Sequence, residues 1–186
     1  MKFLSNSIYH VYNQGNNQET IFKTSTDYLL FLKKVKALIL PECEMLAYCL
    51  MPNHFHFLLM ATEKSAALYH LGNIESNRLS NGFRLLLREY AQDFNKANNR
   101  SGSLFRQKTK AKDLDEYAQA DACLTCFNYI HNNPTAADLV KKAKDWEFSS
   151  LKDYLGLRNG TLCNQKLAYE LLGIDRVYVK EVSMYF

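Results

Sequence analysis

Two histidines, His54 and His56, lie one residue apart inside an otherwise apolar stretch, residues 48–60. The stretch reads as a buried strand, in which side chains alternate between the two faces. Both imidazoles are therefore expected on one face, about 6–7 Å apart along the strand, where both could reach one metal ion. The pattern is short and common, however, and two structural histidines with hydrogen-bond partners are its more frequent explanation.

A second pair of candidates, Tyr129 and Asn133, lies in the sequence FNYIHNNP. Residues four apart on a helix project from the same face, so both are expected one turn apart while His131 points elsewhere. A structural role for Tyr129 remains open, because most of the twelve tyrosines must be packing residues whose hydroxyl group contacts water. Asn133 can likewise be a helix end before Pro134. Taken alone, each residue fits its ordinary explanation better.

Positive charge is concentrated in the middle of the chain. Residues 78–112 carry nine Lys or Arg against two acidic residues, a balance of +7, whereas residues 1–77 balance at zero and residues 113–186 at −3. Such focused charge attracts polyanions. Within LFRQKTKAK, cations at alternate positions would line one strand face, where phosphates relieve their repulsion; a solvated edge strand fits equally well. The candidate DNA contacts are Arg88, Arg100, Arg106, Lys108, Lys110 and Lys112.

These residues must be positioned by a mixed set of elements. Aromatic and β-branched residues predict a strand over residues 7–15, and apolar residues at helical spacing before Pro41 predict a helix over residues 25–40. The Pro52-Asn53 turn splits two apolar runs into an antiparallel hairpin. The remaining expectations are a helical region within residues 66–99, a loop over 98–103, a strand over 104–112, and a helix over 115–133 that Pro134 ends.

This order of strands and helices predicts an α+β fold, a ferredoxin-like split βαβ sandwich with a central antiparallel sheet. Helices would cover one face of the sheet, and the last helix would cover the other face or leave it free. The chain has 186 residues, of which 47% are hydrophobic and 23% charged. This size suits one domain, which we place at residues 1–156, followed by a C-terminal extension of unknown role at residues 157–186.

Composition also indicates the compartment. We find no signal peptide, and no apolar stretch approaches the roughly 18 residues that cross a bilayer. An odd number of cysteines, five, favours free thiols in a reducing compartment. Cys123 and Cys126 lack a second pair at zinc spacing, so we expect buried structural thiols. We therefore expect a cytoplasmic protein.

Four segments together resemble a known family: YHVYNQGNNQETIF, YCLMPNHFHFLL, NRSGSLFRQKTKA and YIHNNPTAADLV. They have the order and spacing seen in single-tyrosine transposases of the HUH nuclease superfamily, and especially in the REP-associated tyrosine transposases. The resemblance runs from about residue 9 to residue 154, and MPNHFH and YIHNNP are specific only in combination. The chain departs from these relatives at Arg106, where Gln is frequent, and at residues 135–138, where Val-Lys-Ala-Gly is frequent.

The resemblance implies a role for each candidate. His54 and His56 would be ligands of a divalent metal, Mg²⁺ or Mn²⁺, Asn133 would supply a third contact, and Tyr129 would be the nucleophile. A phenol with a pKa of about 10 attacks poorly at neutral pH, and a bound metal would polarise the scissile phosphate. The implied enzyme cleaves and rejoins single-stranded, hairpin-containing DNA without ATP, through a 5′-phosphotyrosine. It would be a monomer or homodimer associated with the nucleoid.

Two other functions remain open. A catalytically idle, domesticated protein of the same fold would bind nucleic-acid hairpins, and a zinc-type hydrolase would use the histidine pair differently. The complete set of histidines, tyrosine and asparagine favours the transposase over the idle binder. The sequence shows no obvious Glu, Asp or His as a third ligand near the pair, which argues against the hydrolase.

Overall fold

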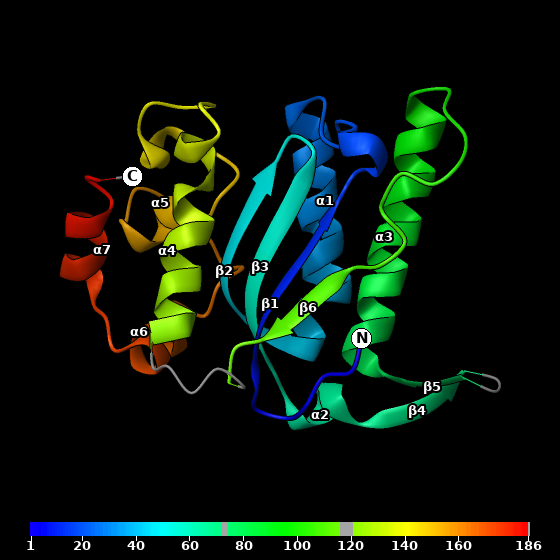
Figure 1. The fold of residues 1–186 in the computed structure, drawn as a ribbon, viewed down its shortest axis with the longest axis horizontal. Coiled ribbons are helices and arrows are strands. Elements are labelled where there is room, and N and C mark those ends of the chain that lie inside the picture. The colour runs from blue at the N-terminus through cyan, green and yellow to red at the C-terminus, as the bar shows by residue number, and fades with distance from the viewer. Residues whose placement is uncertain (72–73, 116–120, 186) are drawn as a thin grey trace.

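The computed structural model describes residues 1–71, 74–115 and 121–185 (Figure 1). Its centre is a four-stranded antiparallel sheet with the strand order β2-β3-β1-β6. The strands are β1 (Ile8–Gln14), β2 (Cys43–Met51), β3 (His54–Ala61) and β6 (Lys110–Asp113). With α1 (Ser25–Leu38) after β1 and α3 (Arg78–Ala97) before β6, this is the split βαβ arrangement. The predicted α+β fold class is confirmed.

Helices α1 and α3 cover one face of the sheet (Figure 1). A capping box between Thr24 and Asp27 fixes the start of α1. The helix then buries apolar side chains at helical spacing, among them Phe31, whose ring lies 5.3 Å from that of Phe55 on β3 and 5.0 Å from that of Tyr90 on α3. These aromatic contacts join the two helices to β3, so the strand that carries the histidines is rigidly backed.

The opposite face is covered by α4 (Asp121–Ala136), which packs on β2 and β3 (Figure 1). Around α4 lie three short helices, α5 (Leu151–Tyr154), α6 (Gln165–Leu172) and α7 (Arg176–Val182). Short 3-10 turns occur elsewhere in the chain at Asn16–Gln18, Leu40–Glu42 and Ala143–Asp145. Leu172 and Val179, from the region beyond residue 156, join the core beneath α4. No helix within the described ranges is long and apolar enough to cross a membrane.

The region before α3 differs from the expected helical stretch. It forms the short helix α2 (Glu63–Ala66) and a small antiparallel hairpin of β4 (Leu68–Leu71) and β5 (Ile74–Asn77), which projects from the body of the protein (Figure 1). Helix α3 begins only at Arg78, because the extended residue Asn77 caps it by accepting a hydrogen bond from the Ser80 amide. Its predicted C-terminal boundary, near residue 98, is confirmed.

The predicted strand over residues 104–112 is wrong in its first half, since β6 begins at Lys110. Leu104 and Phe105 are neighbours in sequence and are both buried in the same core, which the alternation of a regular strand forbids. The buried Asn13 side chain then donates hydrogen bonds to the Arg106 carbonyl and the Thr109 hydroxyl, which hold this segment as a loop. Only two of the four alternating cations, Lys110 and Lys112, therefore share a strand face.

The prediction that Pro134 ends its helix is also wrong, because α4 continues through it to Ala136. The proline removes one N–H donor from the last turn, but its carbonyl accepts a hydrogen bond from the Leu139 amide, 2.9 Å away. A second bond, from the Asp138 amide to the Thr135 carbonyl, completes a Schellman turn. Asp138 has φ of 53° at the position where the resembling family often has Gly, the residue best suited to that conformation.

His131 of α4 makes the stability of the fold dependent on pH. It is fully buried, its Nε2 lies 2.7 Å from the Ser150 hydroxyl, and burial lowers its pKa to about 3. The unfolded chain binds a proton near pH 6.5 and the folded protein does not, so stability is complete above that pH and falls as the pH drops towards 3. Between pH 7 and pH 5 this histidine alone should cost about 2 kcal/mol.

Urea unfolding of the wild type and of His131→Gln at both pH values measures this effect. Other histidines with lowered pKa contribute equally to both proteins, so the loss between pH 7 and pH 5 should be smaller by about 2 kcal/mol in the variant. Comparing the losses removes the variant's own change in stability. An equal loss in the two proteins would show that His131 is not held neutral.

Candidate active site

The histidine pair lies on β3, on the sheet face that α4 covers. The rings of His54 and His56 are 4.9 Å apart and nearly perpendicular, at 88°. His56 is 5% exposed and His54 is half-buried. Their neighbour Phe55 points into the opposite core, with Phe57. The strand alternation therefore places both imidazoles side by side, as predicted.

Hydrogen bonds orient both imidazoles. Nδ1 of His54 lies 2.6 Å from the amide oxygen of Asn53, which can only accept, so His54 carries its proton on Nδ1 and leaves Nε2 with a free lone pair. Nδ1 of His56 lies 2.9 Å from Nε2 of His10 on β1. Nε2 of His56 is buried and finds no hydrogen-bond partner among the described residues. Buried polar atoms of this kind call for an explanation, and a missing ligand is one.

Tyr129 approaches the pair from α4, and Asn133 lies one turn further along the same helix. The Tyr129 ring meets the His56 ring edge to face at 5.4 Å and the His10 ring at 6.0 Å, and the tyrosine is 50% exposed. The Asn133 amide nitrogen donates to the Tyr129 carbonyl at 2.9 Å, which leaves its oxygen available. The structure thus brings the exposed tyrosine of one element onto the buried histidine of another.

Burial sets the protonation of this cluster. It lowers the pKa of His56 to about 2, where the neighbouring His10 and His54 add smaller contributions, and it also lowers the pKa of His54. Burial and, secondarily, Lys112 lower the pKa of His10 to about 4. All three imidazoles are therefore neutral at physiological pH, so the lone pairs of His54 and His56 can bind a metal ion.

The residues present fit a divalent metal. Two neutral imidazoles with free Nε2 atoms and one amide oxygen are donors that Mn²⁺ accepts, and the orphaned Nε2 of His56 is the observation in its favour. No group of three or more His, Cys, Asp or Glu arranged to hold a metal occurs among the described residues. The resemblance to the tyrosine transposases implies Asn133 as the third protein ligand. Cys123 and Cys126 are free, and burial raises their pKa to about 11 and about 12, which fits structural thiols.

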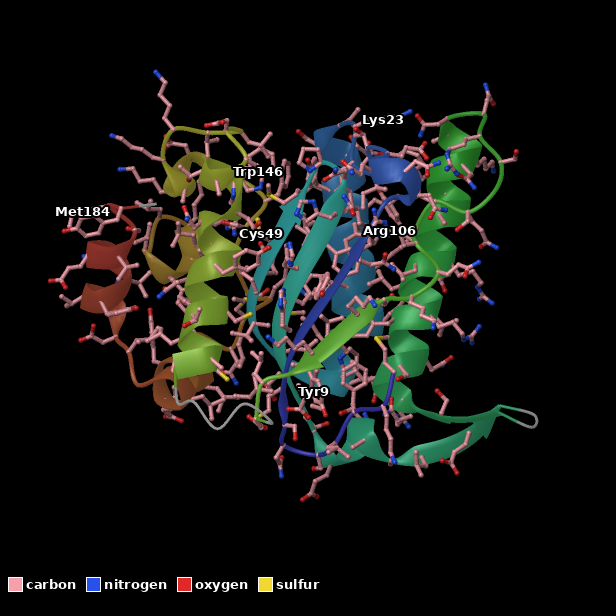
Figure 2. The ribbon with its side chains drawn as sticks, viewed as in Figure 1. Tyr9, Lys23, Cys49, Arg106, Trp146 and Met184 are labelled. Atoms are coloured by element: carbon pink, nitrogen blue, oxygen red, sulfur yellow. The ribbon has the colours of Figure 1, made fainter. Side chains whose placement is uncertain are left out.

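A basic groove lies on the other side of the edge strand, between α3 and residues 103–111, with a volume of about 840 Å³. None of its described lining residues is acidic, and Phe83, Leu87 and Leu104 contribute an apolar floor. Figure 2 shows Arg106 on the segment that runs from α3 to β6. The cations that line the groove are Lys2, Arg84, Arg88, Arg106, Lys108 and Lys110.

Lys110 connects this groove to the histidine face. It pairs with Tyr12 across the sheet, and Tyr12 in turn pairs with His56. Directly opposed residues of antiparallel strands project to the same face, so the Lys110 side chain stands on the histidine face, while the residue also lines the groove at the sheet edge. A chain of phosphates could therefore pass from the groove over the sheet edge to Tyr129.

The remaining predicted DNA contacts are placed differently. Arg100 forms a two-pronged ion pair with Glu19 and donates to the carbonyls of the loop that follows α3, so its guanidinium is used in folding this loop. Lys112 projects on the histidine face opposite His10. The six predicted DNA contacts thus divide into four in the groove, one on the histidine face and one in an ion pair.

The chain was compared with known proteins. No protein-family model matches it, and no curated protein matches it. One similar solved structure is described as the structure of the REP-associated tyrosine transposase bound to a REP hairpin, with 16% sequence identity and a TM-score of 0.56. The superposition covers 81% of this chain and 79% of the other. The likeness shows the fold.

Two groups of residues at the site were not singled out from the sequence. His10 and Tyr12 belong to β1, and their rings lie 5.0 Å and 5.6 Å from that of His56. Alternation along YHVY places His10 and Tyr12 on one face of their strand. Only the pairing of β1 with β3 shows that this is the same sheet face as that of His54 and His56. Arg84 lies one helical turn before Arg88 on α3, a spacing that could have identified it.

Proposed function

We propose that this protein is a metal-dependent tyrosine transposase, a single-stranded DNA endonuclease that cleaves and rejoins hairpin-containing DNA through a 5′-phosphotyrosine. The observation that carries this proposal is the half-exposed Tyr129 ring lying against His56, whose buried Nε2 lacks a partner. The fold it shares with a transposase described as bound to a REP hairpin supports the same assignment. We place the protein in the cytoplasm, at the nucleoid.

The metal site would consist of Nε2 of His54, Nε2 of His56 and the amide oxygen of Asn133. A bound Mg²⁺ or Mn²⁺ supplies positive charge that polarises the scissile phosphate. The protein contributes the orientation, because both imidazoles are fixed through Nδ1 and Asn133 is fixed through its amide nitrogen. These contacts hold the donors in place before DNA binds.

Tyr129 would act as the nucleophile. Its hydroxyl oxygen forms a bond to phosphorus in line with the departing 3′ oxygen, the bond from phosphorus to that oxygen breaks, and the strand ends as a 3′-hydroxyl. The tyrosine loses its proton and the 3′ oxygen gains one. The bond energy stays in the tyrosine ester, so a second 3′-hydroxyl can attack it and rejoin strands without ATP.

The basic groove would hold the DNA backbone. Its six cations and apolar floor suit a single strand, whose phosphates meet Lys and Arg while bases contact apolar surface. Lys110 would guide the strand over the sheet edge, and the half-buried Tyr12 ring offers a stacking surface beside His56. Arg100 would affect DNA binding indirectly, by stabilising the loop that follows α3.

The proposal is tested by incubating the protein with Mn²⁺ and end-labelled, hairpin-containing single strands of varied flanking sequence, followed by denaturing electrophoresis. We expect a labelled strand attached to the protein and a fragment with a free 3′-hydroxyl. Tight binding to hairpins without cleavage in any metal would instead support the idle hairpin-binding protein. Cleavage without a covalent adduct would support a hydrolase that uses water.

Removing cations from the groove should weaken DNA binding. The double variant Arg84→Ala/Arg88→Ala is expected to lose about tenfold in affinity for a single-stranded hairpin oligonucleotide at 0.1 M salt. The slope of log affinity against log salt should fall by about 1.4, or about 0.7 for each lost phosphate contact to a single strand. Fluorescence anisotropy over a salt series measures both quantities.

The matched control is Lys33→Ala/Lys36→Ala, which removes the same charge from exposed positions of α1. It should leave the affinity and the slope close to those of the wild type. Equal losses in the two double variants would mean that net charge, and not the groove, holds the DNA.

A further inference from the structure

We infer that His10 is a positioning residue that fixes the tautomer of His56, so that the Nε2 lone pair of His56 faces the candidate metal site. The functional consequence of this role of His10 rests on the metal dependence proposed above. The tautomer itself is a property of the metal-free protein. His10 stands on β1, and its Nε2 lies 2.9 Å from Nδ1 of His56.

Only one proton can lie between these two nitrogens, which leaves two arrangements. If His10 donates, His56 must carry its own proton on Nε2, where it is buried and has no acceptor among the described residues. If His56 donates from Nδ1, its Nε2 carries only a lone pair, and His10 carries its proton on its own Nδ1. A buried N–H without an acceptor is the rarer and less favourable situation, so the geometry points to donation by His56.

The sequence around His56 explains why a residue from another strand is needed. His54 obtains its acceptor from the adjacent turn residue Asn53. His56 lies between Phe55 and Phe57, whose rings are buried in the opposite core and offer no acceptor. An acceptor for Nδ1 must therefore come from a neighbouring strand, and His10 provides one.

The position of His10 is rigid. β1 is paired on both sides, with β3 and β6, and His10 is the diagonal neighbour of His56, which is opposite Tyr12. The two imidazole rings are 5.0 Å apart and inclined by only 26°. The tautomer is thus set by a hydrogen bond held in the middle of the sheet, independently of α4 and Tyr129. Metal-binding histidines commonly require such a partner on their second nitrogen.

Nitrogen-15 spectra of histidine-labelled, metal-free protein at pH 7.5 report the tautomer directly. In the wild type we expect His56 to carry its proton on Nδ1. In His10→Leu, which removes the acceptor, the proton should move to Nε2, the tautomer that a free histidine side chain prefers. In His10→Gln the side-chain oxygen can accept the bond, so the Nδ1–H form should return.

Mn²⁺ affinity, measured by electron paramagnetic resonance of the free ion, provides the second measurement. His10→Leu should weaken binding about 10–100-fold, and His10→Gln should restore most of it. Leu58→Val trims the buried apolar side chain opposite His10 on the same sheet face, keeps all three imidazoles, and should leave the affinity close to that of the wild type. Equal weakening by His10→Leu and Leu58→Val would mean a merely structural role.

The inference is overturned if wild-type His56 carries its proton on Nε2, or if the tautomer is the same in His10→Leu as in the wild type. The wild-type spectrum and His10→Gln keep the test decisive even if His10→Leu does not fold. A wild-type protein with the expected tautomer that binds no Mn²⁺ would instead remove the metal from the proposed function and leave the role of His10 in the tautomer intact.

Discussion

Tyr129→Phe is expected to abolish the covalent adduct between protein and DNA and to lower strand cleavage by at least about 10³-fold. The substitution removes only the hydroxyl, which is the atom that forms the bond to phosphorus. The ring that meets His56 and His10 stays, so the surrounding contacts are kept. Quantifying adduct and fragments on denaturing gels over a time course measures both effects.

Tyr185→Phe is the matched control, because that tyrosine is 87% exposed near the C-terminus. It should form the adduct at the wild-type rate. Hairpin affinity should be unchanged in both variants, which separates loss of chemistry from loss of binding. Cleavage that survives in Tyr129→Phe would refute the assignment of Tyr129 as the nucleophile and, with it, the proposed mechanism.

Strand periodicity correctly placed His54 and His56 on one sheet face, because they are alternate residues of one strand. The Pro52-Asn53 turn fixes the register of the hairpin, and the apolar run fixes which side chains face the core. Periodicity describes only neighbouring residues, and His56 and Tyr129 are 73 positions apart (129 − 56 = 73). Their association was therefore predicted from the family resemblance. Their contact depends on the packing of α4 across β2 and β3, which no local pattern encodes.

The errors have local physical causes that a sequence pattern does not contain. Alternation in LFRQKTKAK resembles a strand, but the burial of both Leu104 and Phe105 and the bonds from Asn13 keep its first half as a loop. Pro134 resembles a helix end, but in the last turn a proline costs the helix only one N–H donor. Its carbonyl still accepts a hydrogen bond in the Schellman turn, so the helix continues past it. In both places a tertiary or terminal hydrogen bond overrides the local preference.

The candidate site joins a half carried by the sheet to a half carried by a separate helix. His54 and His56 lie on a strand backed by interlocked aromatic rings and held by the pairing of three strands. Tyr129 is carried by α4, whose buried residues Phe127 and Ile130 join the core on that side of the sheet. In the proposed enzyme the nucleophile and the histidines thus lie on separate elements, so a change in the packing of α4 would alter the distance between them.

His56→Ala should remove the response of the protein to Mn²⁺. In the wild type, Mn²⁺ at 100 times its dissociation constant should stabilise the fold by about 2.7 kcal/mol, which raises the melting temperature by about 5–10 °C for a chain of this length. Without the orphaned Nε2, His54 and Asn133 are left as the protein ligands, and the shift should fall below about 2 °C. Melting curves with Mn²⁺, and with EDTA as the metal-free reference, measure this.

The control is His131→Gln, which replaces another buried histidine on the same side of the sheet whose Nε2 bonds Ser150 and does not face the pair. It should melt at a lower temperature than the wild type and keep the full Mn²⁺ shift. An undiminished shift in His56→Ala would place the metal elsewhere. Adduct formation by the wild type in EDTA would show that Tyr129 needs no metal, and the buried, unpartnered Nε2 of His56 would then require a different explanation.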